Sequence, residues 1–129
     1  MAINLALKPR IETDPRSEDW GRGWYGWDPT LSDQQLWDQN RGTWRVSRSR
    51  LGSERFATLS FQGTIRVVVE ITGHEMVGDL VAIEGSVLPP GDTVRDALVG
   101  LVVPSQRNPV SYLATQELDS MSTVDRYLS

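Results

Sequence analysis

Hydrophobic and polar residues alternate most clearly in the segment TIRVVVEIT, near the middle of the chain. A period of two is typical of a strand with one face in the core and the other face mixed in character. The core face of this predicted strand carries Ile65, Val67, Val69 and Ile71. FATLSFQ precedes it across Gly63, so the two segments together predict a hairpin.

Shorter apolar segments predict further strands. They are INLAL near the start, TWRVS (43–47), LVAIEGSVL (80–88), LVV (101–103) and VSYL (110–113). RSRLGSER, which follows TWRVS, is expected to be a connection, and PPGD has the composition of a turn.

Helices are predicted in three places. Ser32 is followed three residues later by Gln35, which fits a capping box and predicts a helix over residues 33–39. Asp92 is expected to cap a short helix in TVRDAL. Apolar residues at helical spacing predict a C-terminal helix over 114–129.

These elements predict a single α+β domain over residues 1–129. We expect two or three short helices beside a small curled mixed β-sheet or a partly closed β-barrel, because such a sheet protects its strand edges. No apolar run is long enough to cross a bilayer, and the start lacks the pattern of a signal peptide. The chain has no cysteine, which excludes disulfides and thiolate metal sites. We expect a cytoplasmic protein with no membrane contact, no metal and no cofactor.

The N-terminal segment, residues 1–31, combines the first strand with a glycine-rich aromatic loop, DWGRGWYGWDP. Its aromatic residues are Trp20, Trp24, Tyr25 and Trp27, all within eight positions. Their spacing fits neither an amphipathic helix nor a half-buried strand. Two interpretations stay open: the loop is a lid packed over the core, or its rings form a cage or stacking platform for a flat ligand.

The net charge of −4 argues at first against a nucleic-acid partner, but the charges are unevenly distributed. Residues 41–66 carry six arginines against one acid, Glu54, whereas the segments on either side are acidic. Arginine presents a planar fork that matches phosphates and base edges, and it stacks on flat rings. The alternative is that these arginines form an ordinary solvated face.

Two further segments carry polar and aromatic groups suited to binding. They are NRGTWRVSR, which follows the predicted helix, and QRNPVSYL near residue 110. Arginines could contact phosphates, rings could stack on bases, and an asparagine could read a base edge. Alternatively, the first segment is a packed tryptophan with arginines in solvent, and the second is a polar turn. The candidate nucleic-acid-binding residues are therefore Trp20, Trp24, Tyr25, Trp27, Asn40, Arg41, Trp44, Arg45, Arg48, Arg50, Arg55, Arg107 and Asn108.

Catalytic motifs are absent from the sequence. His74 is the only histidine, and the Gly73 before it favours a turn. The second histidine of a helical metalloprotease motif, the nucleophile elbow and the phosphate-binding glycine loop are all missing. We expect no enzyme and no catalytic residue; a small hydrolase that uses His74 is the less favoured alternative.

Residues 36–113 resemble small bacterial domains with a PUA-like barrel. The resemblance is carried by LWDQNRGTWRVSRSRLGSERFATLSFQGTIRVVVEITG, by IEGSVLPPG and by VGLVVPSQRNPVSYL. That superfamily includes the SRA, EVE, YTH and ASCH domains, several of which read modified bases. The resemblance implies a modified base such as 5-methylcytosine in an aromatic pocket that opens on the barrel. The positions carried into that site are Asn40, Arg41, Trp44, Arg107 and Asn108.

The sequence therefore predicts a non-enzymatic reader of modified DNA, with double-stranded DNA as partner. Two alternatives remain: an RNA-binding module of the same fold, and a protein-interaction domain that uses an exposed aromatic loop. Whether the chain forms a homodimer stays open.

Overall fold

The computed structural model describes residues 2–18, 20–103 and 108–113, and its main element is a five-stranded mixed sheet in the order β6-β5-β4-β1-β7. The strands of this sheet are β1 (Ala2–Leu7), β4 (Phe56–Phe61), β5 (Thr64–Val77), β6 (Leu80–Val87) and β7 (Val110–Leu113). A second, two-stranded sheet joins β2 (Ile11–Glu12) to β3 (Trp24–Tyr25). The helices of the described residues are α1 (Asp33–Asn40), α2 (Arg48–Gly52) and α3 (Thr93–Leu98). The predicted α+β class is confirmed.

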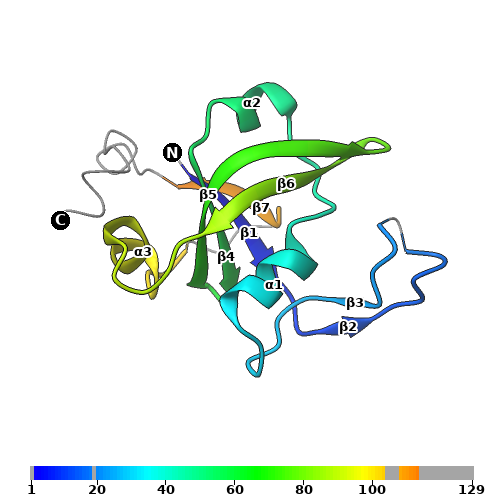
Figure 1. Ribbon diagram of the computed structural model, residues 1–129, viewed down its shortest axis with the longest axis horizontal. Coiled ribbons are helices and arrows are strands. Elements are labelled where there is room, and N and C mark those ends of the chain that lie inside the picture. Colours follow the sequence, from blue (N-terminus) through cyan, green and yellow to red (C-terminus); the bar gives the residue numbers. More distant parts are fainter. Residues whose placement is uncertain (1, 19, 104–107, 114–129) are drawn as a thin grey trace.

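The large sheet mixes parallel and antiparallel pairing. β1 runs parallel to β4 and antiparallel to β7, while β4, β5 and β6 form an antiparallel meander. The long β5–β6 hairpin extends well beyond the other strands (Figure 1). Because β6 and β7 are the two ends of the strand order, the described strands do not close into a barrel.

Hydrophobic side chains cover both faces of the sheet. On one face, Leu36 and Trp37 from α1 pack against residues of β1, β4, β5 and β6. On the other face, Val94 and Leu98 from α3 pack against Phe56 and neighbouring apolar residues. Helices α1 and α3 thus bury their apolar residues against opposite sides of the same sheet (Figure 1).

One detail of the predicted alternation is wrong. Val67 and Val69 lie in the core under α1, but Ile65 lies in the core under α3. The pairing of β4 with β5 shifts register between Leu59 and Ser60. This bulge adds a residue to β5, so the side chains before it point to the opposite face.

The two capped helices form where the sequence predicts them. The Ser32 hydroxyl accepts the backbone N–H of Gln35, and the Gln35 side chain returns to the backbone of Ser32. Asp92 caps α3 by accepting the N–H groups of Val94 and Arg95. Local side-chain chemistry is therefore sufficient to set both helix starts.

Several predicted strands and connections are wrong. TWRVS (43–47) is not a regular strand, because only Trp44 pairs, with Val81. The expected connection after it contains α2, which the Ser47 side chain caps. Residues 101–103 make a single bridge, between Val102 and Thr64. The C-terminal helix expected over 114–129 lies outside the described residues.

The predicted turn at Gly73 and His74 is also wrong. β5 continues through both residues to Val77, and His74 pairs with Ile83 of β6. Instead of a turn, the pairing of β5 with β6 shifts register between Ile71 and Gly73, and the strand continues past this bulge.

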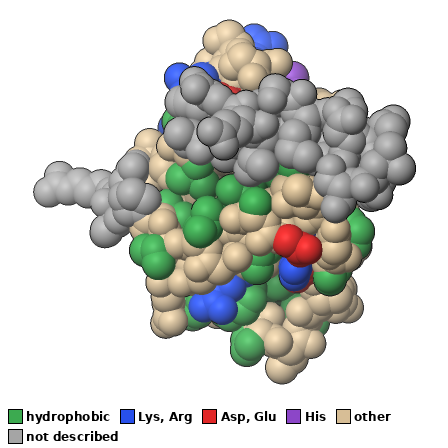
Figure 2. Space-filling model, turned by 90° about the vertical axis from the view of Figure 1, so that its left-hand side faces the viewer, with side chains coloured by type: hydrophobic (Ala, Val, Ile, Leu, Met, Phe, Trp, Pro, Cys, Tyr) green, Lys and Arg blue, Asp and Glu red, His purple; other side chains and the backbone are tan. Residues whose placement is uncertain are grey.

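On the side of the molecule where α3 lies, hydrophobic side chains are interspersed with polar surface (Figure 2). The most exposed large hydrophobic residues of the described chain, Leu101 and Val102, follow α3 in sequence. In the described residues, no helix has both the length and the apolar character needed to span a membrane.

Candidate functional site

The aromatic loop is folded into a ribbon, which we define as residues 8–27. Its strands β2 and β3 pair Ile11 with Tyr25 and Glu12 with Trp24. At its base, the N–H of Trp27 donates to the carbonyl of Lys8 at 2.8 Å. The ribbon projects to one side of the large sheet, below the β5–β6 hairpin (Figure 1).

The C-terminal end of α1 anchors the base of the ribbon. The buried Asn40 amide accepts the Gly26 N–H at 2.7 Å and donates to the Gly26 carbonyl at 2.9 Å and to the Leu36 carbonyl at 3.0 Å. Gln39 donates from its side chain to the Trp24 carbonyl at 2.8 Å. Gly26 has φ +105°, and a Cβ there would lie 2.8 Å from the Lys8 carbonyl oxygen, so this contact requires glycine.

A buried ion pair holds the outer part of the ribbon. The side chains of Glu18 and Arg22 are 9% and 10% exposed, and Arg22 Nη2 lies 2.6 Å from Glu18 Oε1. Arg22 Nε donates to the same oxygen at 3.0 Å. Nη1 of Arg22 donates to the carbonyls of Gln39 and Gly42, just past the end of α1. The guanidinium therefore connects the ribbon to α1, at a helix end where a cation is favourable.

Hydrogen bonds hold Glu18 in its charged form. Burial of the carboxylate by itself raises the pKa of Glu18, but side-chain and backbone hydrogen bonds from Arg22, together with the Trp20 N–H, outweigh it. The pKa of Glu18 is consequently lowered from its ordinary value. The two charges of the pair cancel each other inside the structure.

Between the ribbon, the end of α1 and the tip of the β5–β6 hairpin lies a pocket of about 690 Å³. This volume is within the range of small-molecule sites. Its lining residues come from β1, the ribbon, the segment after α1 and the hairpin: Ala6, Leu7, Lys8, Ile11, Thr13, Asp14, Ser17, Glu18, Arg22, Tyr25, Gly26, Asn40, Gly42, Thr43, Trp44, Leu80 and Pro109.

The aromatic residues of the loop have different surroundings. Tyr25 lines the pocket, as does Trp44 from the segment after α1. Trp27 instead stacks on Phe61 with ring centroids 5.3 Å apart. Trp24 packs against the core beneath the guanidinium of Arg10, 4.2 Å from the ring centroid. Only some of these rings therefore border the pocket.

Trp20 connects the ribbon to the hairpin. Its Nε1 donates to Glu75 of β5 at 3.2 Å, and the Arg41 guanidinium lies 4.5 Å from its ring centroid. A Cβ on Gly42 would come within 3.1 Å of the indole, so the ring packs closely on the backbone after α1. The lid interpretation of the loop fits Trp20, Trp24 and Trp27.

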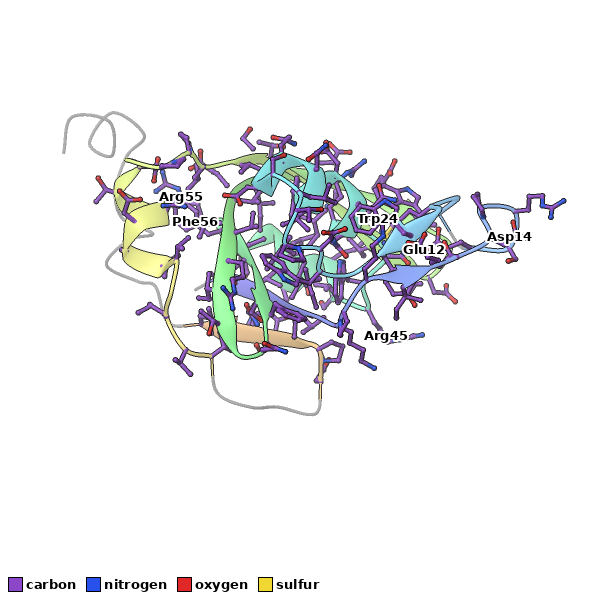
Figure 3. The ribbon with its side chains drawn as sticks, turned by 90° about the horizontal axis from the view of Figure 1, so that it is seen from below. Glu12, Asp14, Trp24, Arg45, Arg55 and Phe56 are labelled. Atoms are coloured by element: carbon purple, nitrogen blue, oxygen red, sulfur yellow. The ribbon has the colours of Figure 1, made fainter. Side chains whose placement is uncertain are left out.

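The candidate arginines do not gather at one place. Arg45 is exposed and lies next to the pocket-lining Trp44. Arg48 is exposed on α2, which lies at the opposite end of the view from the ribbon (Figure 1). Arg55 lies far from the ribbon residues Glu12, Asp14 and Trp24 (Figure 3).

Some of these arginines have partners within the fold. Arg50 lies 3.1 Å from Glu54 and over the Tyr112 ring, and Arg55 lies 3.1 Å from Glu70. By contrast, no carboxylate of the described residues forms an ion pair with Arg45, Arg48 or Lys8.

The second predicted segment is described only in part. Arg107 lies outside the described residues. Asn108 is exposed and accepts the Val110 N–H at 3.0 Å, which fixes a local turn. Its neighbour Pro109 lines the pocket and accepts the Ala6 N–H at 2.8 Å. These contacts agree with the interpretation of the segment as a polar turn. Pro109 of this turn borders the pocket.

Four charged residues of the pocket were missed by the sequence analysis: Lys8, Asp14, Glu18 and Arg22. Glu18 and Arg22 are four residues apart, a spacing that predicts an ion pair only on a helix. No helix was expected there, so their pairing had no sequence signal. Their proximity to the aromatic cluster is the only hint that the sequence offers.

His74 is exposed on β5. Within the described ranges, no group of three or more histidine, cysteine, aspartate or glutamate side chains comes together in a way that could hold a metal ion.

No protein-family model matches the chain, and neither the curated proteins nor the solved structures include a match.

Proposed function

We propose that the chain is a non-enzymatic nucleic-acid-binding domain that takes one base into the pocket between the ribbon and the end of α1. The base is expected to be modified, of the 5-methylcytosine type, and carried by double-stranded DNA. The observation that supports this most directly is a pocket of about 690 Å³ bordered by two aromatic residues, Tyr25 and Trp44. Stacking on an aromatic side chain contributes about 1–3 kcal/mol per base.

The charges around the pocket suit a base better than a phosphate. Glu18 and Arg22, the buried charged pair of the lining, neutralise each other. The part of the ligand that enters should therefore be flat and uncharged. Lys8 on the lining and the exposed Arg45 beside Trp44 are available for the phosphates of the same strand.

The PUA-like resemblance of residues 36–113 supports the same proposal, since several domains of that superfamily read modified bases. It includes Trp44, which borders the pocket. The ribbon lies outside the resemblance, so the role of Tyr25 rests on its position alone.

The first test is fluorescence polarisation at about 0.1 M salt. The probes are a plain duplex, a duplex with 5-methylcytosine, and single-stranded DNA and RNA of matched sequence. We expect the methylated duplex to bind best. Preference for RNA would replace the proposal by the RNA-binding alternative, and binding to none of the probes would favour a protein partner.

The second test separates base reading from phosphate contact. Tyr25→Leu removes the flat ring and should weaken binding of the preferred probe by about 2 kcal/mol, roughly thirtyfold. Arg45→Ala should weaken the binding of all probes alike. It should also reduce the slope of log affinity against log salt concentration by about one. Arg95→Ala, which removes the same charge from α3, is the matched control and should change little. Unaltered preference in a folded Tyr25→Leu protein would show that the base does not enter this pocket.

A further inference from the structure

The pocket has one wall on the ribbon and one on the segment after α1. Tyr25 lies on the first wall, and Gly42, Thr43 and Trp44 lie on the second. The distance between the walls depends on the hydrogen bonds that attach the ribbon to α1. These bonds therefore help to set the shape of any ligand site in the pocket.

The ribbon is attached to α1 at two places. At the base, Asn40 and Gln39 bind the backbone of Gly26 and Trp24. Further out, where the ribbon borders the pocket, Arg22 is the residue whose side chain reaches the carbonyls of Gln39 and Gly42.

Arg22 also organises the ribbon itself. Its Nε and Nη2 donate to Glu18, and its backbone N–H donates to the other carboxylate oxygen at 2.7 Å. Its guanidinium lies 5.1 Å from the ring centroid of Tyr25, within the range of a cation–π contact. One side chain thus contacts the pocket's aromatic wall, its acidic partner and the far wall.

We propose that Arg22 is the positioning residue of this pocket: it sets the ribbon, and with it Tyr25, against the wall formed by Gly42 and Trp44. It acts in this role through its contacts with α1 and Glu18. The identity of the ligand rests on the proposed function, whereas the role of Arg22 in positioning the ribbon does not. The planar guanidinium is needed because the single nitrogen of a lysine ammonium cannot reach Glu18 and two carbonyls together.

The structural arm of the test is amide hydrogen exchange, without ligand. Arg22→Ala should speed exchange of the Thr13 and Gly21 amides, which belong to the ribbon, roughly a hundredfold, because the outer ribbon opens locally. Amides of β4 and β5 should keep their wild-type exchange rates. Arg16→Ala is the matched control: it removes an arginine from the same ribbon whose side chain is 91% exposed and pairs with Asp14.

The ligand arm uses the 5-methylcytosine duplex as probe. Arg22→Ala should weaken binding at least tenfold, Arg22→Lys should recover only part of the loss, and Arg16→Ala should stay within about twofold. Full recovery by lysine would overturn the proposal, because a point charge would then suffice.

The two arms distinguish the failure of each idea. If the wild-type protein binds no probe, the proposed function fails, and the exchange arm still decides the role of Arg22. Ribbon exchange in Arg22→Ala equal to that of Arg16→Ala would overturn the positioning role. So would an equal rise in exchange across β4 and β5, since Arg22 would then support the whole fold rather than the pocket wall.

Discussion

Asn40 is buried at the last turn of α1, where its side-chain amide makes all of its hydrogen bonds within the protein. It binds both the N–H and the carbonyl of Gly26, and it donates to the Leu36 carbonyl. An amide with these bonds has both N–H groups engaged. At this residue the structure supports an anchoring role for a side chain that the sequence analysis placed among the candidate nucleic-acid-binding residues.

Asn40→Ala should lower the free energy of unfolding by about 2–4 kcal/mol, because it leaves buried backbone groups of Gly26 without partners. Asp38→Ala is the control: Asp38 is exposed on the same helix and contacts Gln34, so its loss should cost less than about 0.5 kcal/mol. Urea denaturation of both variants measures the difference. Equal midpoints would contradict the anchoring role.

At the level of elements, Gly85 determines how tightly β6 packs on β5. It pairs with Ile71 beside the register shift, and a Cβ there would lie 2.4 Å from Val69 Cγ1 and 2.8 Å from the Glu70 carbonyl oxygen. Gly85→Ala should therefore cost about 1–3 kcal/mol through overpacking.

The matched control for Gly85 is Gly52→Ala at the end of α2. Nothing lies within 4 Å of an added Cβ there, and alanine is the better helix former, so stability should rise by up to about 1 kcal/mol. Thermal unfolding of the two variants should shift in opposite directions. A neutral Gly85→Ala would show that β6 can move away from Val69.

Some elements with a local signal were predicted correctly. The caps at Ser32 and Asp92, and the alternation in β5 except at Ile65, depend on residues close in sequence. The parallel pairing of β1 with β4 depends on distant segments and has no local signature. In the candidate pocket, Tyr25 and Trp44 were named from their residue type, whereas the pairing of Glu18 with Arg22 became visible only in the fold.

For the whole molecule, the position of the ribbon determines what the surface offers to a partner. The arginines on α2 and at the start of β4 lie away from it (Figures 1 and 3). Two of them, Arg50 and Arg55, have internal partners in Glu54, Tyr112 and Glu70. The basic segment of the sequence is therefore divided between the neighbourhood of the pocket and α2, away from the ribbon.

Carboxylates with lowered pKa values lie on the ribbon and just after it. Burial opposes the charged form of Glu18, but its hydrogen bonds from Arg22 and Trp20 prevail, so its pKa falls below the ordinary 4.5. Hydrogen bonds from Arg16 lower the pKa of Asp14, and those from Thr30 and Arg10 lower that of Asp28. Among the other charged groups, Arg22 contacts Glu18 directly, Asp14 and Arg16 lie on the same ribbon, and Arg41 and Glu75 contact the neighbouring Trp20.

These shifts predict that acid opens the ribbon before it unfolds the sheet. A carboxylate whose folded pKa is depressed stabilises the folded form fully above its unfolded pKa, and this contribution is lost as the pH falls through the folded pKa. Stabilisation by Glu18 should therefore be complete above pH 4.5 and decline below it. Because Trp20, Trp24 and Trp27 lie on the ribbon, an acid titration of tryptophan fluorescence should report the opening, while far-ultraviolet circular dichroism of the sheet stays constant. Glu18→Gln cannot titrate at this position and should show a smaller change over the same range. An identical acid transition in both proteins would assign the opening to other groups.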